Sequence, residues 1–418
     1  MKTYLNSVAL SKPHQRISAE EGTNALYKLT SLSFLMYMNR FRTTKFPKSL
    51  ALIKFAIERF KQQLAELDTD TCLTQEELCL SGLMKKKHYY YGAYLSALTS
   101  IPILSISAGD HQTLLSMAAK TAAITSIKVL DNINDKLSTK DEAILSQWKH
   151  LEAFAGRLTH LDPTENYLKK AENSCMSMAQ WTYNLVSRGL DNKSETLKIY
   201  MKDFKDYIEG QIRSMDEKAH GATSLPTIQD YIQKINEKSV GKIWVDIDFC
   251  FFEKGRGTLN NDELRSLQYI RRAADYFFKG CNIYDDIADL EEDLKLGILS
   301  SVPLLALDMG KIDEQDLERD EVDLMNILRR CGAVDDAVHL GDLIFLQGIR
   351  PLQDARLLND KIDIEAITFG AKVLRMFAIR KWLLKERSFN SLSNTAVSIA
   401  DPKLYRIPET ILQYAVYT

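Results

Sequence analysis

The sequence is poor in residues that interrupt helices. It has only 9 Pro and 18 Gly among 418 residues, which excludes a collagen-like, repetitive or low-complexity protein and indicates long uninterrupted elements. Alternation of polar and apolar residues between turn dipeptides, which is typical of strands, is absent. Apolar residues recur with helical spacing instead. The sequence therefore predicts an all-α fold, organised as one large domain or two.

Cysteine and histidine patterns are also missing. The six cysteines show no C-x-x-C spacing, and the seven histidines are scattered, so the sequence supports neither a zinc site nor a histidine-based triad and favours free thiols over disulfides. Free thiols fit a reducing compartment. No signal peptide follows Lys2, and the charge-free run 92–109 is interrupted by Ser, Thr and Pro102, which favours a buried helix. We expect a soluble, cytoplasmic protein.

The net charge of −2 is unevenly distributed along the chain. Up to Lys61 there are eleven Lys and Arg against three Glu, a basic surplus that is compatible with an anionic partner. Because this segment carries no nucleic-acid-binding motif, a nucleic-acid partner is not expected. Weak contact with a membrane surface and a homodimer both stay open.

The densest charge in the chain lies between Asp285 and Asp293. Six of these nine residues are carboxylates within an otherwise apolar helical pattern. A period of 3.6 residues places Asp285, Asp289 and Asp293 on one stripe of the helix, where carboxylates repel one another unless a cation or water neutralises them. The pattern fits a wall for hard cations, although a solvated surface would show the same pattern.

A second acidic pair, Asp131 and Asp135, closes the apolar run 117–130 far upstream. The two carboxylates share one face of the expected helix. If this helix and the one that carries Asp285 line one cavity, carboxylates facing each other across its mouth could hold several Mg²⁺ ions, which would take their remaining oxygens from a substrate phosphate.

Capping signals set the expected helix boundaries. Thr227 and Asp230 form a capping box that opens a helix through Gly241 to Phe252, with a bend near Gly241. Asn260 caps the helix that carries the acidic run. Other expected features are helices at 25–41 and 49–67, an N-cap at Asp110, a helix start at Asp162-Pro163, and helix ends at Gly189 and Gly297. We expect an N-terminal helical extension (1–80), a bundle (81–385) and a C-terminal segment (386–418).

These motifs resemble those of known enzymes. Asp285-Asp286-Ile287-Ala288-Asp289 is a D-D-x-x-D sequence, and the following 293–307 is similar to the tail of the second aspartate motif of trans-prenyl diphosphate synthases. Asp131-Asn132-x-x-Asp135 resembles the D-x-x-x-D motif of squalene and phytoene synthases and of bacterial large-terpene synthases. The helix from Tyr231 to Gly241 resembles the helix that bends beside the reacting carbon in class I terpene cyclases.

The resemblance, which covers about half of the chain, implies the type I isoprenoid synthase fold, a single large α-helical bundle. It implies a polyprenyl diphosphate substrate and three Mg²⁺ ions bound with its diphosphate. The implied metal ligands are Asp131, Asp135, Asp285, Asp289 and Asp293. Candidate substrate-binding residues are the cations Lys238, Arg271 and Arg272, the bend at Val240 and Gly241, and Phe278, one of several aromatics that could line a dry cavity.

Three functions follow as hypotheses. The first is a class I terpene synthase, which ionises an allylic diphosphate and quenches the carbocation within the same molecule. The second is a prenyltransferase that joins the cation to another isoprenoid or to an aromatic acceptor. The third is a non-catalytic helical scaffold with solvated acidic faces. The Gly-Lys pair that precedes the substrate diphosphate in chain-elongating synthases is missing, which favours the first hypothesis.

Overall fold

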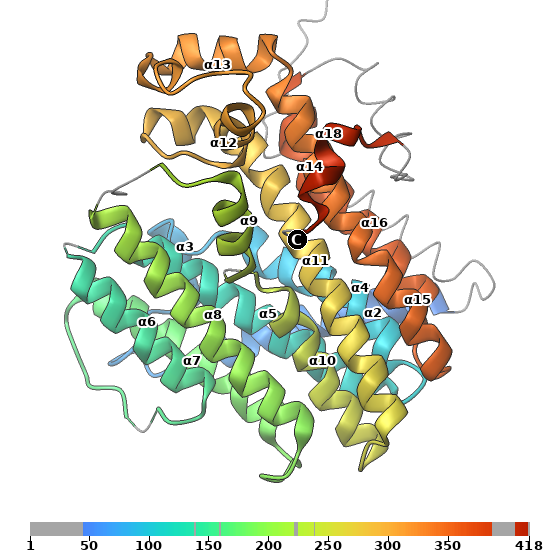
Figure 1. Cartoon of the computed structure of the whole chain (residues 1–418). Coiled ribbons are helices and arrows are strands. Elements are labelled where there is room, and N and C mark those ends of the chain that lie inside the picture. The colour runs from blue at the N-terminus through green and yellow to red at the C-terminus, as the bar shows by residue number, and fades with distance from the viewer. Residues whose placement is uncertain are drawn as a thin grey trace, which may run out of the picture.

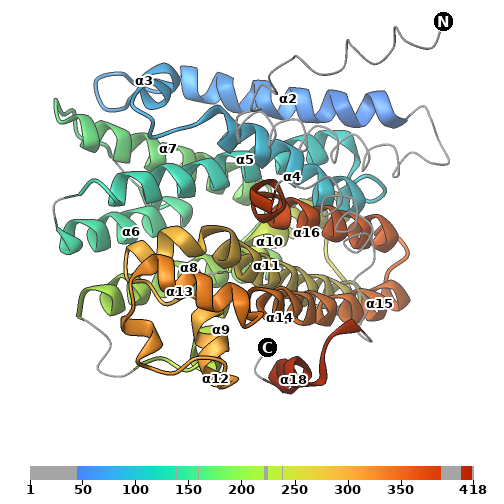
Figure 2. The ribbon, with the colours of Figure 1, turned by 90° about the horizontal axis from the view of Figure 1, so that it is seen from above.

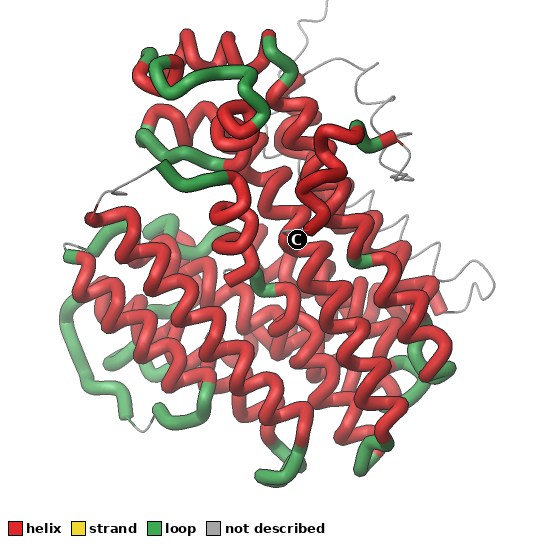
Figure 3. Tube along the Cα trace, in the orientation of Figure 1, coloured by secondary structure: helices red, strands yellow, loops and turns green. Residues whose placement is uncertain are grey.

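A computed structural model describes residues 45–137, 139–158, 160–220, 225–237, 239–386 and 406–416. The expected helix at 25–41 and the candidate cation Lys238 lie outside these residues. Every regular element in the described part of the chain is helical, as Figure 3 shows. The prediction of an all-α fold is therefore confirmed.

The helices pack side by side in one bundle (Figure 1). In chain order they are α2 (Lys45–Ala65), α3 (Gln75–Leu80), α4 (Lys86–Leu104), α5 (Gly109–Asn134), α6 (Lys140–Phe154), α7 (Tyr167–Ser187), α8 (Glu195–His220), α9 (Ile228–Glu237), α10 (Gly241–Arg256), α11 (Asn261–Lys295), α12 (Ser301–Asp308), η1 (Asp316–Glu318), α13 (Glu321–Arg330), α14 (Ala333–Gln347), α15 (Ile349–Leu358), α16 (Ile364–Glu386), α18 (Glu409–Leu412) and η3 (Gln413–Val416).

Helix α11, with 35 residues, runs through the bundle and packs against α10, α14, α15 and α16. Its start follows the predicted capping box: Asn260 Oδ1 accepts the Glu263 backbone N–H at 2.9 Å, and Glu263 in turn accepts the Asn260 N–H. Gly297, just beyond its end, has φ 68°, a left-handed conformation that glycine adopts without steric cost. Both predicted ends of this helix are confirmed.

Two hydrophobic cores divide α11 between them. The larger core contains residues of α2, α4, α5, α7, α8, α10 and α16 together with the first half of α11. The smaller core contains residues of α9, α12, α13, α14 and α18 together with the second half. In Figure 2, α2 lies along one side of the bundle, and α12 and α18 lie at the opposite side. Helix α11 therefore passes through both cores, and its acidic run lies beside the smaller one.

Two expected helix starts are wrong. Helix α5 begins at Gly109, which has φ 74°, so Asp110 lies in the first turn and is not the N-cap. Helix α7 begins at Tyr167, where the side chain of Asn166 accepts the Lys169 N–H at 3.0 Å, rather than at Asp162-Pro163. Of these two helices, only α7 has a side-chain cap, since Ala108 before α5 makes no such hydrogen bond.

The helix expected from Tyr231 to Phe252 is interrupted rather than bent. The predicted capping box opens α9, with Thr227 Oγ1 accepting the Asp230 N–H at 3.1 Å, but α9 ends at Glu237 and α10 starts at Gly241. A Cβ atom at Gly241 would lie 2.4 Å from the carbonyl oxygen of Ala274 on α11. Gly241 is therefore required by the close approach of two helices.

Helix α5 is long and apolar enough to cross a membrane, but 78% of the residues in its apolar window are buried inside the protein. That burial is typical of the core helix of a bundle. The six cysteines are all free thiols, as expected, and Cys72, Cys175 and Cys250 are buried.

Candidate active site

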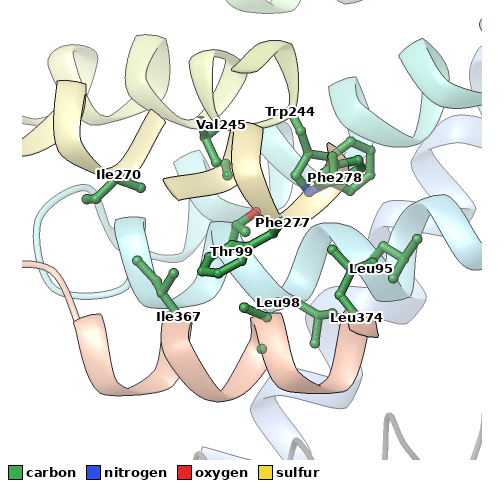
Figure 4. A pocket seen from close by; sticks show the side chains of 13 residues that line it. Leu95, Leu98, Thr99, Trp244, Val245, Ile270, Phe277, Phe278, Ile367 and Leu374 are labelled. Carbon is green, nitrogen blue, oxygen red and sulfur yellow. The ribbon is translucent and has the colours of Figure 1, made fainter. Parts of the chain in front are cut away.

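An apolar cavity lies between α4, α10, α11 and α16 (Figure 4). The aromatic rings of Trp244, Phe277 and Phe278 form much of its wall, and its free volume is about 30 Å³. The hydroxyl-bearing Thr99 is the polar side chain among the lining residues. Aliphatic side chains complete the lining labelled in the close-up, and they are Leu95, Leu98, Val245, Ile270, Ile367 and Leu374. The predicted candidate Phe278 thus lies at a cavity, together with Trp244 and Phe277.

The cavity and the acidic run share one face of α11. Ala274 and Phe278 line the cavity, and Asp285 follows Phe278 by seven residues, which is two helical turns or about 10 Å. Asp289 continues the stripe by one more turn. Asp285 is exposed, whereas Asp289 and Asp293 are half-buried. Helical geometry therefore sets two carboxylates above an aromatic-lined space.

Asp286, the second aspartate of the D-D-x-x-D sequence, points elsewhere. Its Oδ2 accepts hydrogen bonds from the Tyr231 hydroxyl at 2.8 Å and from the Ser301 backbone N–H at 3.3 Å. Burial raises the pKa of Asp286 to about 7, although these hydrogen bonds oppose the shift. Asp286 joins α11 to α9 and to the start of α12, which is a structural role.

The upstream pair lies at the end of α5. Asp131 is half-buried and approaches Lys128 Nζ at 3.4 Å, while Asp135 is the exposed C-cap of the helix. Burial raises the pKa of the Asp131 carboxyl, and Lys128 opposes the shift. Helix α10 contacts both α5 and α11. No aspartate of either pair lines the apolar cavity or the polar cavity between α8, α10 and α11. The convergence of the two aspartate pairs on one cavity therefore stays a prediction.

The donor atoms suit magnesium, which binds oxygen ligands and commonly takes several from water and phosphate. Among the described residues, no three His, Cys, Asp or Glu side chains are grouped closely enough to hold a metal ion. The five predicted ligands are all carboxylates at or near the surface. They fit Mg²⁺ sites that are completed by substrate oxygens better than a closed protein cage.

The predicted cations Arg271 and Arg272 lie nearer the start of α11 than the acidic run does. Arg271 Nε donates to Asp203 Oδ2 at 2.6 Å and lies 3.5 Å from Asp246 Oδ1. Arg272 is exposed. Both line a polar cavity between α8, α10 and α11, about 21 Å from Asp285 along the helix axis at 1.5 Å per residue. The half-buried Val240 immediately precedes α10.

A buried ion pair behind the apolar cavity was not predicted. Lys120 and Asp248 form a salt bridge with both side chains fully buried. Lys120 Nζ also donates to Thr99 Oγ1 at 2.5 Å and lies 5.0 Å from the Trp244 ring centroid. The hydroxyls of Ser100 and Ser116 donate to Asp248. The available signal was Lys120, a lysine in the middle of the apolar run 117–130, since a charge buried there needs a partner.

Comparisons with solved structures identify the fold. The geranylgeranyl pyrophosphate synthetase of the archaeon Geoglobus acetivorans is 16% identical, with a TM-score of 0.50 over 78% of this chain and 97% of that one. The geranylgeranyl pyrophosphate synthetase of Pyrococcus horikoshii is also 16% identical, with a TM-score of 0.48 over 80% and 99%. A single-residue variant of cucumene synthase is 12% identical, with a TM-score of 0.45 over 82% and 97%.

No family model matches the sequence, and no curated protein matches it either. At these identities the likeness defines the fold alone. The chain has an all-α fold of the type I isoprenoid synthase kind, as the sequence motifs implied.

Proposed function

We propose that the protein is a Mg²⁺-dependent class I terpene synthase, which ionises an allylic polyprenyl diphosphate and then cyclises or otherwise quenches the carbocation. The observation that supports this most strongly is the single face of α11 that bears both Phe278, at the aromatic-lined cavity, and Asp285, two turns above it. Ionisation needs charge stabilisation at the diphosphate and a dry space for the cation.

In this proposal Asp285 and Asp289 hold Mg²⁺ from α11, with Asp293 next to them, and Asp131 and Asp135 hold it from α5. The bound ions would supply the positive charge that stabilises the departing diphosphate. The rings of Trp244, Phe277 and Phe278 exclude water and present π faces to a cation. Side chains along the wall must move to admit a prenyl chain, because the free volume of the cavity is only about 30 Å³.

Asp248 neutralises Lys120 behind this wall. An unpaired ammonium 5.0 Å from the Trp244 ring would otherwise compete for the π face that a carbocation would use. The pair thus keeps the wall electrically neutral while leaving the Thr99 hydroxyl at the cavity. We place the protein in the cytoplasm, where a prenyl diphosphate substrate would meet it.

The second candidate is a prenyltransferase that passes the cation to another molecule. It is favoured by the segment after Asp293, which resembles the corresponding tail of prenyl diphosphate synthases. Both functions share the ionisation site, but a transferase needs a second pocket for its acceptor.

The test is incubation with Mg²⁺ and prenyl diphosphates of C10 to C35 length, supplied one at a time. We expect release of diphosphate and a hydrocarbon or alcohol that mass spectrometry detects in a pentane extract. EDTA should abolish release without changing the circular dichroism spectrum, because the proposed sites fill only with substrate. Release that requires a second prenyl diphosphate or an aromatic acceptor would establish the transferase instead. No release under any of these conditions would favour the scaffold.

A further inference from the structure

The polar cavity between α8, α10 and α11 gathers cations from three helices. Its free volume is about 540 Å³. The charged residues that line it are Lys202 from α8, Lys242 from α10, and Arg271, Arg272, Asp275 and Lys279 from α11. Five of these six side chains are therefore cationic, and the carboxylate of Asp275 is the single acid among them.

The acids nearby do not neutralise the cavity fully. Lys242 and Lys279 share Asp275, with nitrogen to oxygen distances of 3.6 and 2.5 Å. Lys202 lies 3.4 Å from Asp206 on the exposed face of α8. Asp203 and Asp246 both pair with Arg271. Among the described side chains, five cations therefore face four acids even if every carboxyl is ionised.

Arg272 carries most of this surplus. Its guanidinium lies 5.7 Å from the Tyr276 ring centroid, and one of its nitrogens lies 3.4 Å from the Tyr276 hydroxyl. These contacts orient the guanidinium beside the cavity but leave its charge uncompensated. A planar guanidinium with free N–H groups is suited to bidentate contact with phosphate.

The cavity is separate from the aspartate-bearing face. Arg271, Asp275 and Lys279 face α8 and α10, whereas Ala274 and Phe278 face the apolar cavity. A volume of about 540 Å³ leaves room for a diphosphate group with part of its hydration, since a bound water needs only about 10–15 Å³ of such space.

We propose that this cavity binds a diphosphate group directly through Arg272, Lys242 and Lys202, without a metal ion. The group could be free inorganic diphosphate or the head of a prenyl diphosphate. Both offer the same charge and the same oxygens to these side chains, and direct charge-assisted hydrogen bonds need no bridging cation. Binding here depends on no turnover, so the site exists whether or not the proposed reaction takes place.

Isothermal titration of the full chain with inorganic diphosphate in EDTA tests the proposal. EDTA removes any metal-dependent binding at Asp285, and we expect the remaining affinity to fall by about tenfold in Arg272→Gln and in Lys242→Met. Arg59→Gln and Lys54→Met remove the same charges from the exposed face of α2 and should bind like the wild type. Circular dichroism confirms folding of each variant, and the exposed Arg272 tolerates replacement.

The proposal is overturned if the wild type does not bind in EDTA, if the two cavity variants bind as tightly as the wild type, or if the α2 controls weaken binding equally. A parallel titration with dimethylallyl diphosphate separates the two sources. Tighter binding of the prenyl ester assigns the site to a substrate head group, and tighter binding of the inorganic ion assigns it to released diphosphate. Asp285→Asn should retain this binding, so a failure of the proposed reaction would leave the result unaffected.

Discussion

Helix α11 passes through two hydrophobic cores, and its charged side chains differ between them. In the first half, Arg271 and Lys279 make ion pairs with acids on α8, α10 and α11 itself. The second half is rich in carboxylates, among which Asp285 is exposed and Asp289 is half-buried. The same helix therefore pairs its buried charges with acids at one end and gathers carboxylates at the other.

The comparison of the two halves of α11 distinguishes charged side chains that serve stability from those that serve function. A buried ion needs a partner, because desolvation costs several kcal/mol per charge. The pairs of the first half are therefore explained by folding alone. Exposed carboxylates stay hydrated and need no buried partner. Crowding them on one helix costs stability through repulsion, so folding alone does not explain the acidic run. Within the acidic half, Asp286 has a structural role, because it bonds to Tyr231 and Ser301.

The largest expected effect is the loss of turnover when a carboxylate of the acidic stripe is removed. Asp285→Asn or Asp289→Asn should lower kcat for diphosphate release by about 10²- to 10³-fold, if each removes a metal ligand. Glu292→Gln, an exposed acid in the same run, is the matched control and should leave kcat unchanged. Near-normal turnover in both aspartate variants would show that the acidic half of α11 has no role in turnover.

The next effect concerns stability. Arg271→Met should lower the free energy of unfolding by about 3 kcal/mol, because it leaves the buried Asp203 and Asp246 without their cation. Arg272→Met, one position further along, should change it by less than about 0.5 kcal/mol, since its side chain is exposed. Urea denaturation measures both. Equal losses would show that the two arginines do not differ as their burial indicates.

Sequence periodicity and capping predicted most of the fold. Asn260 and Glu263 reveal the start of α11 because a capping box needs only residues three positions apart. The sequence could not distinguish a break before Gly241 from a bend. The break depends on Ala274, which lies 33 positions away in the sequence and approaches Gly241 only in the folded chain.

The candidate site was predictable to a lesser extent. The D-D-x-x-D spacing identified Asp285 and Asp289, but it also included Asp286, whose partners on α9 and α12 are set by tertiary packing. The buried partner of Lys120 could not be chosen among many acids, and Asp248 lies 128 residues away. The pairing of Arg271 with Asp203 rather than with a ligand has the same origin.

A smaller effect is expected where α10 meets α11. Gly241→Ala would place a methyl group 2.4 Å from the Ala274 carbonyl oxygen, and backbone cannot rotate away as a side chain can. We expect a loss of about 1–3 kcal/mol in the free energy of unfolding, as for other overpacked sites. Alanine in an open helix would instead stabilise it by up to about 1 kcal/mol. The sign of the change in a urea denaturation therefore decides whether the close approach is real.

The smallest effect is a pH dependence at the contact between α10 and the first half of α11. Asp246, on α10 beside Arg271, is fully buried, and neither carboxyl oxygen has a hydrogen-bond partner among the described residues. Burial raises the pKa of Asp246 well above its ordinary value, the negative charge of Asp203 adds to the shift, and Arg271 opposes it.

A carboxyl whose pKa is higher in the folded state contributes stability below its unfolded pKa, about 3.9, and loses that contribution as the pH rises through the folded value. Asparagine does not titrate, so Asp246→Asn should gain stability relative to the wild type between pH 5 and pH 8. Asp206→Asn, exposed on α8, should follow the wild type at both pH values. Urea denaturation at the two pH values gives the comparison. If Asp246→Asn and the wild type also change in parallel, Asp246 keeps its charge throughout, and Arg271 then compensates two ionised carboxylates in the interior of the bundle.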